Sequence, residues 1–225
     1  MDPATGTKYL YFTAANRDNL IIGMEMDNWL KPRWETMTIV ICTQYYTVED
    51  WKNDVTSGTD CEDPDSRVNE GPAVVYHDGK YYMTLSVNSY EDSSYSVLQA
   101  VGDSPLGPFR KLREEENGRF LSGNTEGSKE VSGTGHHSFV TVGDKLYVIY
   151  HRHNSVAVGG GNRNVAVDEV KWVTIKNIYG QDMDVFQSQT IYAKQTSSHL
   201  QQLAVHGCLQ IHQKVQLPMP YYIHW

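Results

Sequence analysis

Three segments of the chain share one strand-forming pattern, and this repetition limits the fold more than any other feature. The segments are Thr5–Asn16 (TGTKYLYFTAAN), Asp78–Asn88 (DGKYYMTLSVN) and Val142–Asn154 (VGDKLYVIYHRHN). Each has a Gly-containing turn, a Lys and then a run of aromatic and β-branched residues, a composition typical of strands. Asp78-Gly79 and Gly143-Asp144 are two-residue connections that close tight hairpins. The pattern predicts β-hairpins rather than helices.

The spacing of the repeats favours one all-β architecture over others. The lysines of the three segments, Lys8, Lys80 and Lys145, lie 72 and 65 residues apart. This exceeds the common ~40–50-residue period of propeller blades but accommodates four long strands per unit. Regularly spaced, Gly-punctuated strands can form a sandwich, a barrel or a radial array. Repetition at this length favours the radial array.

The composition changes near the C-terminal end. From Gln187 to Trp225 there are eight Gln, four of the nine His, two Lys and no Asp or Glu. The net charge of -8 therefore divides into -10 for residues 1–186 and +2 for residues 187–225. We expect 1–186 to be the repeat domain. We interpret 187–225 as a tail that is disordered or translated out of frame, rather than as a separate module.

Composition also excludes several classes of partner. A net charge of -8 argues against nucleic acid, whose recognition depends on basic surface. No apolar run approaches the ~18 residues of a membrane span, and the first residues lack the pattern of a signal peptide, so localisation is left open. The spacing of Cys42, Cys61 and Cys208 predicts free thiols. The 15 Tyr and 5 Trp suit a ligand that stacks and also hydrogen-bonds, such as a sugar.

A carboxylate opens the apolar strand of the second repeat. Glu70 stands between Asn69 and Gly71-Pro72 in VNEGPAVVYHDGKYYMTLS (Val68–Ser86). A charged residue at this position can be an ordinary solvated strand end. Its neighbours favour a functional interpretation, because further motifs follow in a fixed order.

With the SPLGPF turn (Ser104–Phe109) and SGTGHHSFV before the third repeat, this hairpin resembles glycoside hydrolase family 43 over roughly Thr5–Phe186. The resemblance implies a five-bladed β-propeller glycosidase that acts on arabinose- and xylose-containing polysaccharides. It also implies an inverting mechanism with an Asp base, a Glu acid and a second Asp that tunes the acid. Because there are three hairpin repeats, we expect an incomplete propeller of about three blades: a partial β-propeller glycosidase domain over 1–186.

The resemblance assigns roles to two residues. Glu70 matches the general acid, and we expect it to face inward at the propeller axis. Catalysis needs it protonated, and burial beside another carboxylate would raise its pKa accordingly. His136 matches a channel histidine that lies near a calcium ion or a water molecule. No cofactor is required, calcium is an option, and the implied partner is a plant-type pentose glycan.

The two Asp partners are harder to find. The position ten residues before Lys8, which would match Glu70 in the first repeat, falls upstream of Met1, so the tuning Asp has no counterpart. Asp2 resembles the Asp-Pro of the base but lies only 68 residues before Glu70, and its alternative is a turn residue beside Pro3. The sequence is therefore similar to an N-terminally truncated member, from which we expect little or no activity.

Other candidates have competing interpretations. Arg163 could reach the sugar or the acid, or could form structural salt bridges. Trp51, in TVEDWKND, could lie in a loop near the pocket and bind substrate. Further aromatic residues could form a sugar-stacking platform, although aromatic residues in strands more often belong to the core. They are Trp29, Trp34, Tyr81, Tyr82 and Tyr95. A zinc site built from His136, His137, His151 and His153 matches no known ligand spacing.

Two functions from different classes remain open at this point. The first is a glycoside hydrolase in which Glu70 is the proton donor. The alternative is a non-catalytic propeller that binds glycans or a protein through the same face. The order of the motifs favours the enzyme, whereas the missing Asp residues favour an inert form of this chain.

Overall fold

The computed structural model describes residues 1–14, 20–41, 68–123, 131–153 and 159–189. The chain divides into two units, of which the first, Met1–Thr190, is compact and contains all the described residues. The described residues form strands and two short 3₁₀ turns, η1 (Trp34–Thr36) and η2 (Glu114–Glu116). The all-β prediction is therefore confirmed. No helix in these described ranges has the length and apolarity that crossing a membrane requires.

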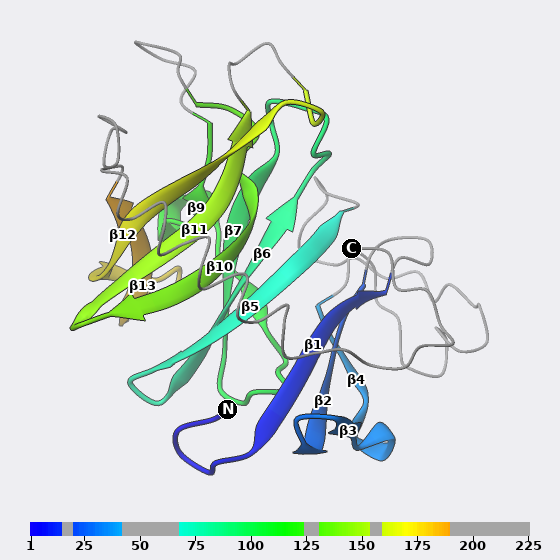
Figure 1. Ribbon diagram of the computed structural model, residues 1–225. Helices are drawn as coiled ribbons and strands as arrows, with labels where there is room; N and C mark the ends of the chain where they lie inside the picture. The colour runs from blue at the N-terminus through cyan, green and yellow to red at the C-terminus, as the bar shows by residue number, and fades with distance from the viewer. Residues whose placement is uncertain (15–19, 42–67, 124–130, 154–158, 190–225) are drawn as a thin grey trace, which may run out of the picture. The chain divides into compact units, whose positions relative to one another are not determined.

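The strands of the first unit form three antiparallel sheets (Figure 1). The first sheet contains β1 (Lys8–Ala14), β2 (Leu20–Asn28), β3 (Lys31–Pro32) and β4 (Thr38–Ile41). The second contains β5 (Asn69–His77), β6 (Lys80–Val87), β7 (Ser96–Gly102), β8 (Arg110–Lys111) and β9 (Arg119–Leu121). The third contains β10 (Gly135–Val142), β11 (Lys145–His153), β12 (Arg163–Lys176) and β13 (Asp182–Gln189).

The three repeats predicted from the sequence correspond to β1, β6 and β11. Asp78 and Gly79 close the β5–β6 hairpin with φ values of 44° and 79°, which is the left-handed geometry that such two-residue turns need. β6 and β11 each pair with a strand on both sides, whereas β1 pairs only with β2 among the described strands. The first sheet thus lacks, in this part of the chain, a counterpart of β5 and β10.

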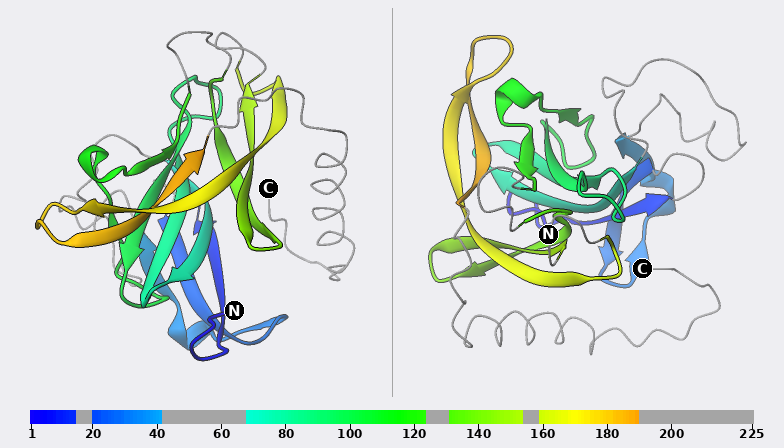
Figure 2. Two further views of the ribbon diagram at one scale, coloured as in Figure 1. Left: turned by 90° about the vertical axis from the view of Figure 1, so that its left-hand side faces the viewer. Right: turned by 90° about the horizontal axis from the view of Figure 1, so that it is seen from above.

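The sheets lie side by side in sequence order (Figure 2), and alternation along β6 explains how they pack. Met83, Leu85 and Val87 on one face join a buried cluster with residues of the first sheet. Tyr82, on the other face, joins a second cluster with residues of the third sheet. Because successive side chains of a strand point to opposite faces, the second sheet is apolar on both sides and lies between its two neighbours.

Two further contacts bear on the predicted domain limits and motifs. The hydroxyl of Tyr11 in β1 donates a hydrogen bond to the carbonyl of Pro105, 2.6 Å away, so the SPLGPF turn joins the second sheet to the first. β13 continues to Gln189, past the fully buried Phe186. The strand region therefore extends beyond the compositional change at Gln187, and the nature of residues 187–225 stays a prediction.

Candidate active site

The candidate site lies where β5 and β10 begin, and these two strands are in contact (Figure 1). Both strands are irregular at this point, because their hairpin registers shift between Glu70 and Ala73 and between Gly135 and Ser138. His136 has a positive φ of 49°, which is uncommon for a residue other than Gly. Irregularities of this kind redirect side chains out of the ordinary alternation. Here they bring two polar side chains together.

Glu70 lies near the start of β5, as the sequence predicts, with its side chain 25% exposed. Its Oε1 atom accepts a hydrogen bond from the hydroxyl of the fully buried Tyr95. The Nδ1 atom of His136 lies 3.9 Å from the same oxygen. Glu70 is thus a partly buried carboxylate held by Tyr95, just before β7, and by His136 of β10, rather than a solvated strand end.

The electrostatic surroundings of Glu70 differ from the expectation. Interaction with the His136 ring, opposed by burial and aided by the Tyr95 hydroxyl, lowers the pKa of Glu70 below the ordinary value. The prediction that a second carboxylate would raise this pKa is wrong for the described residues. The groups next to Glu70 are a hydrogen-bond donor and an imidazole, and both favour the ionised form.

Further polar side chains extend the site toward β12. The backbone N–H of His136 donates to Oγ of Ser86, 2.7 Å away, and Ser86 is the register partner of Glu70. The His151 ring stacks on Tyr95 with ring centroids 5.4 Å apart. Arg163 lies over the Tyr90 ring at 5.3 Å, and its Nη1 atom is 3.5 Å from Nε2 of His151. The structure therefore connects Arg163 to Glu70 through His151 and Tyr95.

Two of the four clustered histidines serve other contacts. His137 is buried and hydrogen-bonds with the Thr84 hydroxyl, and burial lowers its pKa to about 3. His153 is buried between the Ser132 hydroxyl and the Tyr90 carbonyl, 3.3 and 3.0 Å away. Both side chains are therefore structural hydrogen-bonding groups.

The described residues do not fit direct binding of a metal ion. They contain no group of three or more His, Cys, Asp or Glu side chains that could hold one. The buried polar side-chain atoms near the site without a partner belong to Asn69, Thr134, His137 and His151. Calcium prefers six to eight oxygen ligands, whereas this mixed set suits a water molecule better. A calcium ion or a water molecule near His136 stays a prediction.

The structure does not bring Asp2 to Glu70. Oδ1 of Asp2 accepts from the backbone N–H of Ala4 at 2.9 Å and Oδ2 accepts from the Thr5 hydroxyl at 2.6 Å. Asp2 also hydrogen-bonds with Tyr81, which lies five residues along β6 from the register partner of Glu70. At ~3.3 Å per residue this is roughly 17 Å. The geometry of Asp2 matches the alternative of a turn residue.

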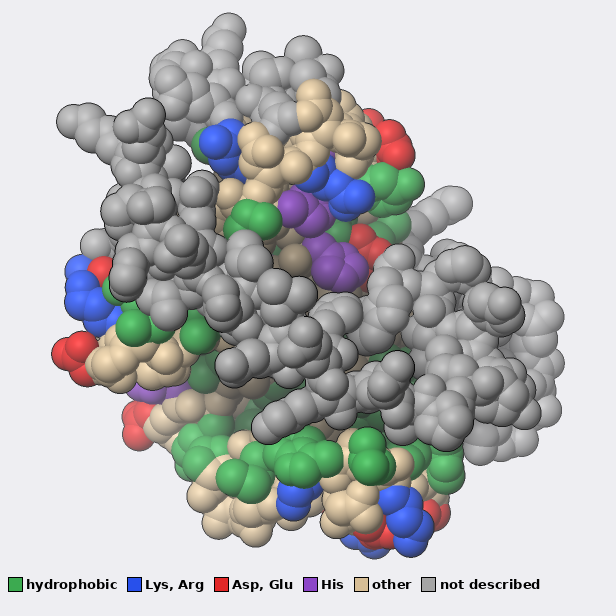
Figure 3. Space-filling view, in the orientation of Figure 1, with side chains coloured by type: hydrophobic (Ala, Val, Ile, Leu, Met, Phe, Trp, Pro, Cys, Tyr) green, Lys and Arg blue, Asp and Glu red, His purple; other side chains and the backbone are tan. Residues whose placement is uncertain are grey.

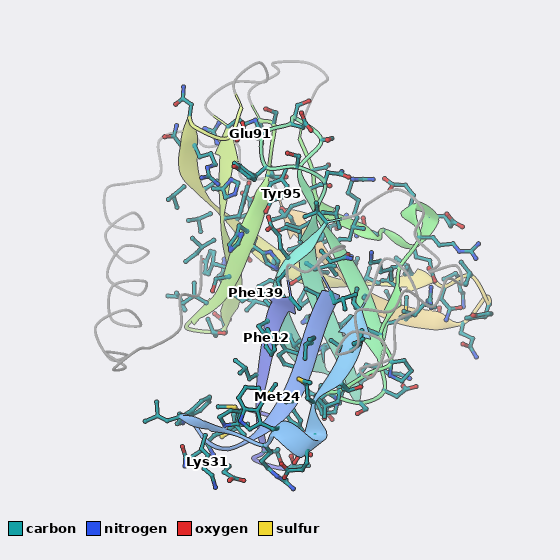
Figure 4. All side chains as sticks on the ribbon, turned by 90° about the vertical axis from the view of Figure 1, so that its right-hand side faces the viewer. Phe12, Met24, Lys31, Glu91, Tyr95 and Phe139 are labelled. Atoms are coloured by element: carbon teal, nitrogen blue, oxygen red, sulfur yellow. The ribbon has the colours of Figure 1, made fainter. Side chains whose placement is uncertain are left out.

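The aromatic candidates divide into buried and exposed groups. Tyr81, Tyr82 and Tyr95 are buried. Trp29 and Trp34 are exposed by 64% and 66%, so they are not core. They flank β3, whose Lys31 lies at the end of the sheets opposite to Tyr95 (Figure 4). Trp51 lies outside the described residues.

One face of the molecule presents the polar groups of the site. The side chain of His136 is 51% exposed. In the space-filling view, histidine side chains are accessible beside basic and acidic side chains (Figure 3). The sequence does not mark Ser86 as a site residue, and it points to His151 only as one of four clustered histidines and to Tyr95 only as an aromatic. Their contacts with the site join distant parts of the sequence, and no local motif marks them.

Comparison with known proteins agrees with this fold. The family model of the glycosyl hydrolases family 43 matches residues 1–174. The β-D-galactofuranosidase xynD of Aspergillus niger is 32% identical over 102 residues, which cover 45% of this chain and 28% of that protein.

Two solved structures have a fold similar to that of this chain. A thermostable family-43 glycoside hydrolase is 28% identical with a TM-score of 0.60, over 84% of this chain and 55% of that one. An endo-1,4-β-xylanase from Bacteroides thetaiotaomicron is 25% identical with a TM-score of 0.55, over 83% of this chain and 56% of that one. The chain thus spans little more than half the length of these structures.

Fold and comparisons together define an incomplete β-propeller of the glycosidase class, with three sheets in the described residues. The chain belongs to glycosyl hydrolases family 43. The fold class and the resemblance predicted from the sequence are therefore confirmed.

Proposed function

We propose that this chain is the part of an inverting glycoside hydrolase that carries the general acid, and that Glu70 is the acid. The observation that supports this most is the position of Glu70, a quarter exposed at the start of β5 and anchored by Tyr95 on one oxygen. Anchoring fixes the direction in which a carboxyl presents its proton. Surface carboxylates without a role do not need such a buried partner.

The proposed reaction uses one proton from Glu70. A water molecule, activated by a base, attacks the anomeric carbon on the face opposite Glu70. The bond from that carbon to the glycosidic oxygen breaks, and Glu70 gives its proton to the leaving oxygen. In an inverting enzyme the two carboxyl groups stand ~6.5–9.5 Å apart to leave room for the water. We assign the base to no described residue, so we expect slow turnover by this chain alone.

The proposed substrates are arabinose- and xylose-containing glycans. One relative, an endo-1,4-β-xylanase, carries a name within this range, and another is named as a β-D-galactofuranosidase. Arabinofuranose and galactofuranose are both five-membered sugar rings, so a pocket for one suits the other in ring shape. Arg163, next to His151 at the edge of the site, is the proposed cation that contacts the sugar hydroxyls.

The test supplies azide, a nucleophile that needs no base to activate it. The full chain is incubated at about pH 4, below the ordinary Glu pKa of about 4.3 because the pKa of Glu70 is lowered, with phenyl arabinofuranoside, xyloside and galactofuranoside, with and without azide. Azide can attack the anomeric carbon in place of activated water and yield a glycosyl azide of inverted configuration. Phenol is a weakly acidic leaving group that depends on a proton donor, and we expect azide to accelerate its release. Glu70→Gln should lower the azide-dependent rate about 10²-fold or more, which is the usual contribution of a general acid.

Glu115→Gln is the matched control, because Glu115 is an exposed carboxylate of η2, which connects β8 and β9 of the sheet that contains Glu70. It should leave the azide-dependent rate unchanged. If no substrate reacts with or without azide, or if Glu70→Gln keeps the full rate, the proposed function is refuted.

One observation favours the second candidate, a non-catalytic glycan-binding propeller. The surroundings of Glu70 lower its pKa and keep it ionised at neutral pH, which suits a hydrogen-bond acceptor for sugar hydroxyls. In that case calorimetry with arabino- and xylo-oligosaccharides would show binding without turnover, and Glu70→Gln would change the affinity alone.

A further inference from the structure

The two oxygens of Glu70 have different surroundings. Oε1 accepts the hydrogen bond of Tyr95 and is also the oxygen that lies 3.9 Å from His136 Nδ1. Both of these contacts therefore fall on one oxygen of a carboxyl group that is a quarter exposed. A carboxyl held in this way is fixed in rotation and offers Oε2 to a ligand.

The position of Tyr95 is itself tightly defined. Its ring is fully buried and stacks on His151 with an interplanar angle of 8°. A Cβ atom added to Gly135 would lie 2.0 Å from Cε1 of Tyr95, so only Gly at that position admits the ring. Burial, together with the charge of Arg163, lowers the pKa of His151 to about 4, so the stacked ring is neutral near pH 7.

We propose that Tyr95 is a positioning residue that anchors Oε1 of Glu70 and thereby assigns Oε2 as the oxygen that carries and transfers the proton. This inference rests on the proposed function of Glu70 as the general acid. When Glu70 is protonated, the proton sits on Oε2 and the Tyr95 hydroxyl still donates to the carbonyl oxygen Oε1. When Oε2 has given its proton to the leaving oxygen, the same hydrogen bond stabilises the carboxylate. The Tyr95 proton is not transferred in either state.

The test compares two buried tyrosines that each donate to a carboxylate. Tyr95→Phe removes the hydroxyl next to Glu70 and keeps the ring that stacks on His151. Tyr150→Phe is the matched control, because the Tyr150 hydroxyl donates to Asp168 at 2.8 Å within the third sheet. Glu carboxyl signals of the ¹³C-labelled full chain are titrated by NMR, and Glu70→Gln identifies the Glu70 signal.

The expected result has a titration part and a kinetic part. Tyr95→Phe moves the midpoint of Glu70 to higher pH, because a donor to the carboxylate is lost, and Tyr150→Phe leaves it in place. In the azide assay, Tyr95→Phe lowers kcat by about tenfold, a fraction of the ~10²–10⁴-fold effect of a general acid. KM stays unchanged, and the loss of activity on the basic side begins at a higher pH. A merely structural role would move none of these pH values.

The test separates a failure of the Tyr95 inference from a failure of the proposed function of Glu70. If turnover depends on Glu70 but Tyr95→Phe leaves the Glu70 midpoint and kcat unchanged, the inference is overturned and the proposed function stands. Tyr95→Phe could move the Glu70 titration midpoint while neither the unmodified chain nor any variant turns over a substrate. That result overturns the proposed function and, with it, the catalytic part of the inference.

Discussion

Nδ1 of His136 lies 3.9 Å from Oε1 of Glu70, although the two residues come from the first strands of different sheets. The interaction of this ring is the largest cause of the lowered pKa of Glu70. Glu70 must be protonated to act as an acid, so its activity falls as pH rises through that lowered pKa. A chain with these surroundings alone should work best in acid.

His136→Asn should raise the pKa of Glu70, because it removes the imidazole and leaves the Tyr95 hydroxyl. Carboxyl NMR of the full chain measures this directly. His77→Asn is the control, since His77 lies at the other end of β5 and contacts Asp184 at 3.0 Å. Equal Glu70 midpoints in His136→Asn and the unmodified chain would show that the ring does not act on this carboxylate.

Gly135→Ala should destabilise the second and third sheets where they meet. Its new Cβ would lie 2.0 Å from the buried Tyr95 ring, and overpacking of this kind costs typically about 1–3 kcal/mol. Gly161→Ala is the control, because a Cβ there meets no atom within 4 Å. Denaturant unfolding gives the comparison, and equal midpoints for the two variants would contradict the packing described for Tyr95.

Glu116→Gln should reduce stability at neutral pH. Glu116 is fully buried, accepts from Arg110 through both oxygens at 2.7 and 2.9 Å, and accepts from the backbone N–H of Arg113 and of Ile178. Breaking a buried ion pair by removing one partner costs about 3–5 kcal/mol. Unfolding at pH 7 should show this loss, and Glu115→Gln, an exposed neighbour, should show almost none.

The stability difference between Glu116→Gln and the unmodified chain should change with pH in a defined direction. Burial raises the pKa of Glu116, but hydrogen bonds from Arg110 and the backbone outweigh it and lower the pKa to about 2. A lowered folded-state pKa gives stability that is present above the unfolded pKa of about 4.3 and is lost as pH falls toward the folded value. The difference between Glu116→Gln and the unmodified chain should therefore shrink between about pH 5 and pH 2. A constant difference across that range would argue against the buried ion pair.

Gln99→Leu should weaken the contact between the second and third sheets. Gln99 is fully buried, and its side chain accepts from the Phe186 N–H at 3.0 Å and donates to the Phe186 carbonyl at 3.1 Å. Leaving a buried polar group unpaired costs about 1–3 kcal/mol. Gln187→Leu, an exposed substitution next to Phe186 on β13, is the control in chemical unfolding. Similar free energies of unfolding for the two variants would show that the bridge contributes nothing.

The sequence predicted the hairpins because their signals are local. Gly79 supplies a positive φ in the β5–β6 turn, and apolar runs beside it alternate with the period of a strand. The place of Glu70 near the start of an apolar strand followed from the same pattern. Such features depend on residues a few positions apart, so one sequence contains them.

The surroundings of Glu70 could not be predicted in the same way. Ser86 reaches the site through the pairing of β6 with β5, and Tyr95 stands just before β7, which pairs with β6. His136 reaches the site through a local irregularity of β10. No motif encodes those contacts. The expectation of a raised pKa failed because it assumed a carboxylate where the structure places an imidazole and a phenol.

The most direct test of Glu70 as proton donor is the dependence of rate on the leaving group. Aryl glycosides of the substrate accepted by the full chain, spanning phenols of high and low acidity, are assayed with azide for the unmodified chain and Glu70→Gln. A donated proton makes the rate nearly independent of phenol acidity. We predict a shallow dependence for the unmodified chain and a steep one for Glu70→Gln, with the greatest loss for the least acidic phenols. Parallel dependences in the two proteins would contradict the assignment.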